Sequence, residues 1–173
     1  MALFSAAWLF WGVATLSPPA SWWGPVSGLL LVMVFALVLA GRRAVIAIAR
    51  TSTPRARVSP FRRPAYRRAV MFEAVAIPVA VVLLDLHDLA TYIPPVVAAI
   101  VGVHFFGLVA AFRTRLYWWV GLAMCAIAGL SVALAPVADW ATFVALGCGA
   151  VLWCTALGRI VRIRRRLSPA SAA

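Results

Sequence analysis

Residues 93–115 read IPPVVAAIVGVHFFGLVAAFRTR. Residues 93–112 contain no charged side chain, and two arginines, Arg113 and Arg115, follow almost at once. An α-helix needs about 20 consecutive apolar residues to cross the hydrocarbon core of a bilayer. The stretch therefore predicts a transmembrane helix over 93–112 whose last residues reach one membrane surface.

Similar apolar stretches occupy most of the chain. Hydrophobic residues make up 65% of the 173 residues and charged residues 12%, whereas a soluble domain has roughly 45–50% apolar and about 25% charged residues. This composition predicts an all-α fold, a polytopic transmembrane helical bundle forming a single domain over residues 1–173. The predicted spans number six, pair into three hairpins, and lie near residues 2–16, 26–48, 69–86, 93–112, 116–134 and 140–163.

The positions of the arginines orient these spans. All sixteen basic residues are arginines. They fall in three clusters, at residues 42–68, 113–115 and 159–166. The turns on the other side contain no basic residue, at residues 17–25, 85–95 and 135–140. Because basic residues concentrate in cytoplasmic loops, we expect both termini inside a bacterial cytoplasmic (inner) membrane, with a basic loop over 50–68 and a basic tail over 159–173.

The first predicted span is short, and a cleaved signal sequence is the alternative. Such a sequence normally begins with a positively charged region, which MALFSAAW lacks. We therefore favour a retained span.

The net charge of +12 would favour nucleic-acid binding in a soluble protein. Here the charge lies at helix ends, so we expect the partner to be a lipid bilayer with anionic headgroups and no nucleic acid. Each basic residue near such a surface contributes about 1 kcal/mol. The predicted headgroup contacts are Arg55, Arg57, Arg62, Arg63, Arg67 and Arg68.

Glu73 and His104 lie inside predicted spans, where polar groups are expensive and usually paired. At about 1.5 Å per residue, Glu73 lies roughly 7 Å in from Arg68, and His104 roughly 13 Å in from Arg113. The offset is about one helical turn, which two side chains can bridge. The pair is then a structural clamp or a proton-relay or ligand-binding site. In a third alternative, Glu73 reaches an interfacial arginine and His104 bonds to the backbone or a hydroxyl.

A second polar cluster lies in the turns without arginine: Asp85, His87, Asp88 and Asp139. Carboxylates and an imidazole can hold a divalent cation, but acidic outer loops need no special cause, so we predict no metal. We also predict no cofactor. A haem needs two axial ligands at matched depth, which His87 and His104 do not provide, and the three cysteines form no CxxC motif.

Aromatic and small residues mark the predicted interfaces. Tyr117, Trp118 and Trp119 stand at the inner end of their span, where such residues anchor helices at headgroup depth. Small residues recur every four positions, a spacing that lets helices approach closely. These stripes favour internal packing over a homo-oligomer, and they comprise Gly121, Cys125 and Gly129 in one span and Ala141, Ala145 and Gly149 in the next.

The chain resembles a family of uncharacterised bacterial six-helix integral membrane proteins. Its members carry a pattern similar to IVGxHFxPLAxxF followed by a tyrosine, matched here by Ile100–Phe112 and Tyr117, with Phe72-Glu73 in the preceding span. This sequence has Gly107 where the pattern has proline. The resemblance implies the six-helix architecture and emphasises Glu73 and His104, but it brings no known activity.

Two functions follow as hypotheses. One is a small transporter, a channel-like protein or a membrane ligand-binding protein that uses Glu73 and His104, which predicts a polar cavity reaching both residues. The alternative is a scaffold or accessory subunit that binds a partner membrane protein, which predicts a closed core. An enzyme is less favoured, because the sequence contains no paired-acid, Ser–His–Asp, HExxH or phosphate-loop signature.

Overall fold

Every element of the described chain is a helix. The computed structural model describes residues 2–16 and 63–167, together with scattered residues between 32 and 46. The elements are α1 (Ala2–Thr15), α3 (Pro64–Leu86), the short 3-10 helix η2 (Ala90–Tyr92), α4 (Ile93–Phe112), α5 (Arg115–Leu134), the 3-10 helix η3 (Val137–Asp139) and α6 (Trp140–Leu167). The all-α prediction is therefore confirmed for these residues, and the predicted span at 26–48 lies mostly outside them.

Four of these helices are long and apolar enough to cross a membrane, which indicates a membrane protein. They cover Pro64–Leu86, Ala90–Phe112, Leu116–Leu134 and Val137–Arg162. The predicted span over 93–112 coincides with α4. Helix α3 begins before its predicted span, because Pro64 can occupy the first turn, where its missing amide hydrogen is not needed. Arg67 and Arg68 are therefore the fourth and fifth residues of α3 and do not lie in the preceding loop.

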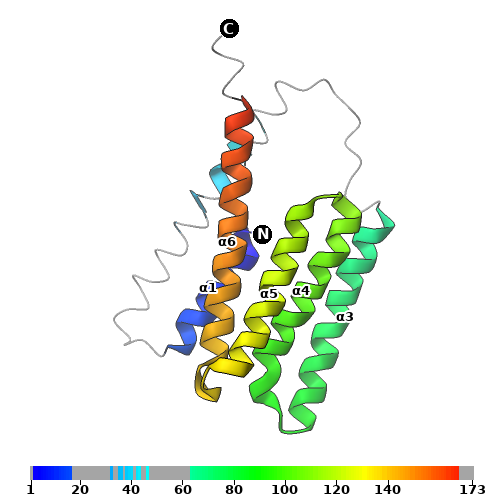
Figure 1. The fold of residues 1–173 in the computed structure, drawn as a ribbon, viewed down its shortest axis with the longest axis vertical. Coiled ribbons are helices and arrows are strands. Elements are labelled where there is room, and N and C mark those ends of the chain that lie inside the picture. Colours follow the sequence, from blue (N-terminus) through cyan, green and yellow to red (C-terminus); the bar gives the residue numbers. More distant parts are fainter. Residues whose placement is uncertain are drawn as a thin grey trace.

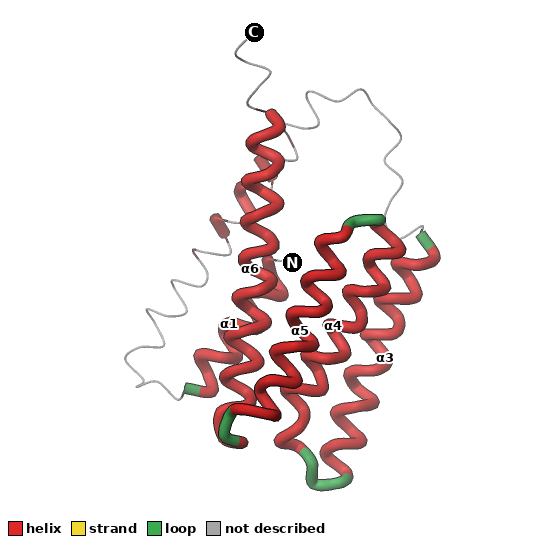
Figure 2. Tube along the Cα trace, in the orientation of Figure 1, coloured by secondary structure: helices red, strands yellow, loops and turns green. Residues whose placement is uncertain are grey.

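Consecutive helices run up and down, and their connections alternate between the two ends of the bundle. Figure 2 shows the α3–α4 and α5–α6 turns at one end and the α4–α5 turn at the other. The α4–α5 turn is tight because Arg113 takes a left-handed conformation (φ 51°) and its amide bonds to the carbonyl of Val109. In Figure 1, α6 continues past the α4–α5 turn at the end where Arg113 and Arg115 lie.

Helix α6 stands between α1 and α5 and joins them into one bundle (Figure 1). The largest fully buried side chains among the described residues belong to α5 and α6: Met124, Ser131, Val144, Cys148 and Leu152. Helices α4 and α6 also touch each other. The core of the described part therefore lies where α4, α5 and α6 meet.

Helix α1 packs along α6 in the antiparallel direction. Gly12 lies against Leu146, and Gly149 lies against Leu9. The hydroxyls of Thr15 and Thr142 form a 2.7 Å hydrogen bond at the end of this contact. Helix α1 has only 14 residues, so it is about 21 Å long and shorter than the roughly 30 Å hydrocarbon core.

The α4–α5 contact is the closest approach between neighbouring helices at a predicted small-residue stripe. A methyl group added to Gly121 would lie 2.7 Å from the carbonyl oxygen of Gly102, and one added to Gly102 would lie 2.5 Å from the Cys125 sulfur. The stripe therefore serves internal packing at Gly121 and Cys125. At Gly129 an added methyl group meets nothing within 4 Å.

This difference gives a matched pair of substitutions in one helix. Gly121→Ala is expected to lower the free energy of unfolding by about 1–3 kcal/mol, the usual cost of overpacking. Gly129→Ala should instead be neutral or stabilising by up to about 1 kcal/mol, because alanine is the better helix former. Thermal unfolding of both variants in one detergent would measure the difference. Equal shifts in the two variants would contradict the close approach seen at Gly121.

Helix α3 lies at the edge of the bundle. Ala69 is its one fully buried residue among those described, and its main neighbour is α4. Pro78 lies inside the helix and leaves the carbonyl of Ala74 without its amide partner, which permits bending. Helix α3 is therefore the least restrained of the four long helices.

Candidate functional site

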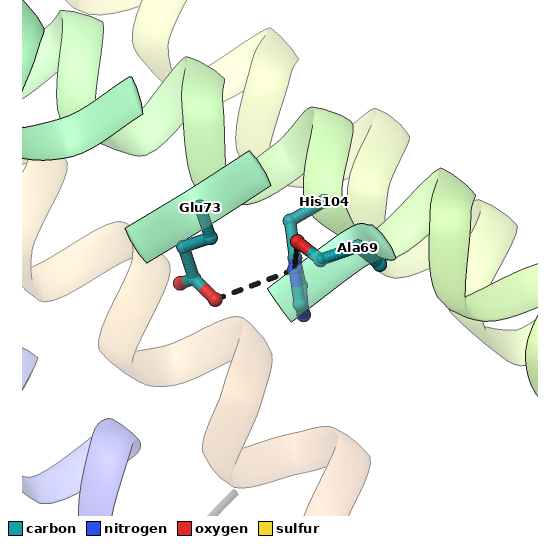
Figure 3. A network of polar contacts seen from close by, with 3 residues as sticks. All are labelled: Ala69, Glu73 and His104. Atoms are coloured by element: carbon teal, nitrogen blue, oxygen red, sulfur yellow. Dashed lines mark hydrogen bonds and ion pairs between the residues drawn. The ribbon is translucent and has the colours of Figure 1, made fainter. Parts of the chain in front are cut away.

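Glu73 and His104 touch, as their predicted depths allow. The Nδ1 atom of His104 lies 3.3 Å from Oε2 of Glu73. The same nitrogen lies 2.9 Å from the backbone carbonyl oxygen of Ala69. Figure 3 shows His104 of α4 facing both acceptors, which lie one turn apart on α3. The imidazole thus joins the two helices through a carboxylate and a carbonyl at once.

The hydrogen-bonding pattern determines which ring nitrogen carries the hydrogen. A carbonyl oxygen can only accept, so Nδ1 is the donor to Ala69, and the carboxylate is a second, longer acceptor. The Nε2 atom points away from both groups (Figure 3). In this tautomer Nε2 is an acceptor.

Small residues allow this contact. A methyl group added to Gly107 would lie 2.9 Å from the side chain of Ala69, so the two backbones are close just beside the imidazole. Glu73 follows Ala69 by four residues and therefore lies on the same face of α3. Helix α4 is continuous through Gly107, where the family pattern has a proline. Glycine serves here as the contact point with α3.

A cavity of about 310 Å³ reaches both residues. It lies among α3, α4, α5 and α6, and its walls combine aromatic, aliphatic and charged side chains. The lining residues are Tyr66, Glu73, Val101, His104, Phe105, Leu108, Phe112, Tyr117, Leu152 and Arg159. The transport or ligand-binding hypothesis predicted a polar cavity that reaches both residues. This cavity reaches both, but its walls are mostly apolar, with Glu73, His104 and Arg159 among their polar side chains.

The cavity is elongated along the helices. On α4 its lining extends from Val101 to Phe112, eleven residues or about 16 Å along the axis. Glu73 and His104 lie towards the Val101 end. Tyr66, Tyr117 and Arg159 lie towards the Phe112 end, close to the arginine-rich surface. The cavity thus extends from that surface about halfway through a 30 Å hydrocarbon core.

Two arginines and a group of aromatic rings surround the end near Phe112. Arg159 donates a 2.9 Å hydrogen bond to the Tyr117 hydroxyl, and its guanidinium lies 5.9 Å from the centre of the Tyr117 ring. Arg63 donates to the carbonyl of Ala111 and lies 5.8 Å from the Phe112 ring. Because Arg159 is also exposed, it places a positive charge where the cavity meets the surface.

The six arginines that were predicted to contact lipid headgroups fall into three groups. Arg63 is bonded to α4, as described above. Arg67 and Arg68 are exposed near the beginning of α3. The remaining ones, Arg55, Arg57 and Arg62, lie outside the described residues.

The outer polar cluster shows no metal-site geometry. Asp85 lies in the last turn of α3, and His87 and Asp88 form the turn that follows, where the Asp88 amide bonds to the Asp85 carbonyl. Asp139 lies in η3. All four side chains are exposed, and no group of three or more His, Cys, Asp or Glu residues within the described ranges is arranged to hold a metal ion.

Sequence reasoning did not assign Tyr117 or Arg159 to the site. Tyr117 was predicted to anchor the helix beside two tryptophans, but it is only 6% exposed and faces the cavity, whereas Trp118 is 52% exposed. Arg159 was used only as part of the basic cluster that orients the predicted spans. A residue's rotation about its helix decides its role here. In a chain with apolar residues on every face, the sequence carries little signal for that rotation.

The arrangement provides three kinds of contact to a molecule in the cavity. Glu73 offers a carboxylate acceptor, Nε2 of His104 offers an acceptor or a donor according to its protonation, and Arg159 offers a cation. Aromatic rings and leucines provide the apolar walls. No protein family, no curated protein and no solved structure matches this chain, and the family resemblance stays a prediction.

Proposed function

We propose that this protein binds a small amphiphilic molecule in the cavity among α3–α6. The observation that carries the proposal is a 310 Å³ cavity with Glu73 and His104 towards one end and Arg159 at the other. Ligand pockets have volumes of about 300–1,000 Å³, mostly apolar walls and a few placed polar groups. The cavity therefore suits a compact ligand with an apolar or aromatic body, an acceptor or anionic group near Arg159, and a polar group near Glu73.

The proposal includes the membrane setting. The chain has six spans in a bacterial cytoplasmic membrane, with both termini and the arginine clusters inside. The distribution of arginines supports this orientation through the preference of basic residues for the cytoplasmic side. The cavity then opens towards the cytoplasmic face. The packing of α1 on α6 supports a retained first span.

Binding leads to transport if one wall of the cavity moves, and α3 is the wall suited to that. Its burial is slight, and Pro78 permits bending above Glu73. A shift of α3 would separate Glu73 from His104 and open the inner part of the cavity. A small transporter is therefore the form of the function that we favour.

An accessory subunit is the second candidate. The observation that favours it is the exposed apolar face of α3, which includes Phe72, Val75, Val79 and Val82. Such a face suits a partner helix as well as it suits lipid. A homo-oligomer built on the same face belongs to this candidate.

The protein extracted with its native lipids and weighed intact by native mass spectrometry distinguishes these candidates. We expect a stoichiometric small molecule on the wild-type protein. Glu73→Gln should lower its occupancy, because a hydrogen bond to a charged group contributes about 1.5–3 kcal/mol and its loss weakens the affinity for the ligand at least about 10-fold. Asp85→Asn changes a carboxylate on the same helix outside the cavity and should leave occupancy unchanged. A co-purifying membrane protein with no small molecule would favour the accessory subunit instead.

A further inference from the structure

A second hollow lies on the outer side of the α3–α4 pair. It has a volume of about 440 Å³ and is lined chiefly by small and apolar residues. Among them are Ala65, Ala69 and Phe72 of α3 and Phe106, Gly107 and Ala110 of α4. His104 contributes to this groove and to the inner cavity, so its side chain is part of the wall between them. We call this hollow the lateral groove.

The shape of the lateral groove follows from its residues. Ala69 and Gly107 bring the helices together and form a shallow floor, while Phe72 and Phe106 are the largest apolar residues along it. Phe106 is held by Trp118 of α5, whose ring centre lies 4.7 Å away. The lining residues extend from Ala65 to Phe72, about 10 Å along the helix axis. The lateral groove is therefore an open, mostly apolar hollow that runs along α3 and α4.

One cation lies beside the groove. Arg68 lines it and is exposed, and it is the fifth residue of α3. Because side chains on a helix point towards its N-terminus, the Arg68 guanidinium can reach the arginine-rich surface. A guanidinium at headgroup depth binds phosphate oxygens through parallel hydrogen bonds. The groove thus has a phosphate-binding group beside a space that suits a hydrocarbon chain.

We propose that the lateral groove is a binding site for one anionic phospholipid, with its phosphate on Arg68 and one acyl chain along the floor between α3 and α4. The site goes beyond a general attraction of arginines to anionic surfaces, because it adds a shaped apolar contact beside a single cation. It is also separate from the inner cavity, and it stands whether or not that cavity binds a ligand. A bound chain packs beside His104 and shields that wall of the cavity from the bilayer.

Titration of the purified protein with defined lipids tests the site. Native mass spectrometry would compare phosphatidylglycerol with phosphatidylcholine of the same acyl chains. We expect the first molecule of phosphatidylglycerol to bind at least about fivefold more tightly than the first molecule of phosphatidylcholine. This difference is the effect of about one basic residue at an anionic surface. Arg68→Gln should remove this preference. Arg67→Gln, an exposed neighbour that does not line the groove, should retain it. Equal losses in both variants would overturn the site.

A second pair of variants tests the apolar part of the lateral groove. Ala110→Phe places a ring in the groove from an exposed position and should weaken binding of both lipids about 10-fold. Ala126→Phe adds the same ring at an exposed position of α5 away from the groove and should change neither. Free glycerol phosphate should not displace the bound lipid. If it does, or if Ala110→Phe binds lipid as the wild type does, the acyl-chain contact is refuted.

Discussion

Replacing His104 with Leu is expected to lower the free energy of unfolding by about 3 kcal/mol, the upper end of the cost of leaving a buried polar group without its hydrogen-bond partner. Leucine roughly keeps the volume of the imidazole, so the loss comes mainly from Glu73. In the described part of the chain, His104 provides the polar contact recorded for that carboxylate.

Replacing Glu73 with Leu should lower the free energy of unfolding much less. In Glu73→Leu the imidazole keeps its shorter hydrogen bond to the carbonyl of Ala69, so we expect a loss of about 1 kcal/mol, the net value of one hydrogen bond. The double variant, His104→Leu with Glu73→Leu, should recover most of the loss, because replacing both partners with apolar groups is nearly neutral. The asymmetry distinguishes this arrangement from a simple two-residue clamp.

Reversible unfolding in mixed detergent micelles, followed by tryptophan fluorescence, would measure all three variants. His87→Leu is the control, because this histidine is exposed in the turn after α3 and its loss should change stability by no more than about 0.5 kcal/mol. If the two single variants lose the same free energy and the double variant recovers none, the bond to Ala69 and the pairing of Glu73 are both refuted.

A cysteine at Leu108 should react with a water-soluble thiosulfonate on the order of 100-fold faster than one at Leu122, because the thiolate is the reactive species and it forms in water, not in hydrocarbon. The exposed fractions of the two leucine side chains alone would predict that the cysteine at position 122 reacts faster. Leu108 is 8% exposed, whereas Leu122 is 46% exposed. Leu108 lines the inner cavity, but Leu122 faces outwards from α5.

The experiment requires a background in which Cys125, Cys148 and Cys154 are replaced by alanine. With a sulfonate-bearing reagent, Arg159→Gln should slow the reaction at Leu108→Cys several-fold, because a cation at the mouth attracts the anionic reagent. Arg162→Gln, on the same helix but outside the cavity lining, is the matched control. Adding the membrane-impermeant reagent to one side of sealed vesicles would also show which membrane face the cavity meets. A faster reaction at Leu122→Cys would mean that the cavity holds no water.

The bounds of α4 and the Glu73–His104 contact were predictable because charge and depth determine them. Arg113 ends α4 where its apolar stretch ends, and counting residues from the arginine-rich surface puts Glu73 and His104 within one turn of each other. Both inferences use only distance along the helix axis, which the sequence gives directly.

The direction in which a residue faces about the helix axis cannot be inferred in this way. Tyr117 and Trp118 are neighbours, yet one lines the cavity and the other is exposed, because successive residues point about 100° apart. In a soluble protein the polar side of a helix reveals this rotation. In a membrane the lipid-facing and core-facing sides are both apolar, so neither the residues that line the cavity nor the place of Arg159 at its mouth was visible in the sequence.

The packing of α1 against α6 has a consequence for biosynthesis. Thr15 and Thr142, which bond to each other, are 127 positions apart. At a synthesis rate of about 5–20 residues per second, the ribosome completes Thr142 roughly 6–25 s after Thr15. Throughout that delay α1 remains without its partner, and its 14 residues are fewer than a full span needs. The order in which the helices are made thus determines when the last interface can form.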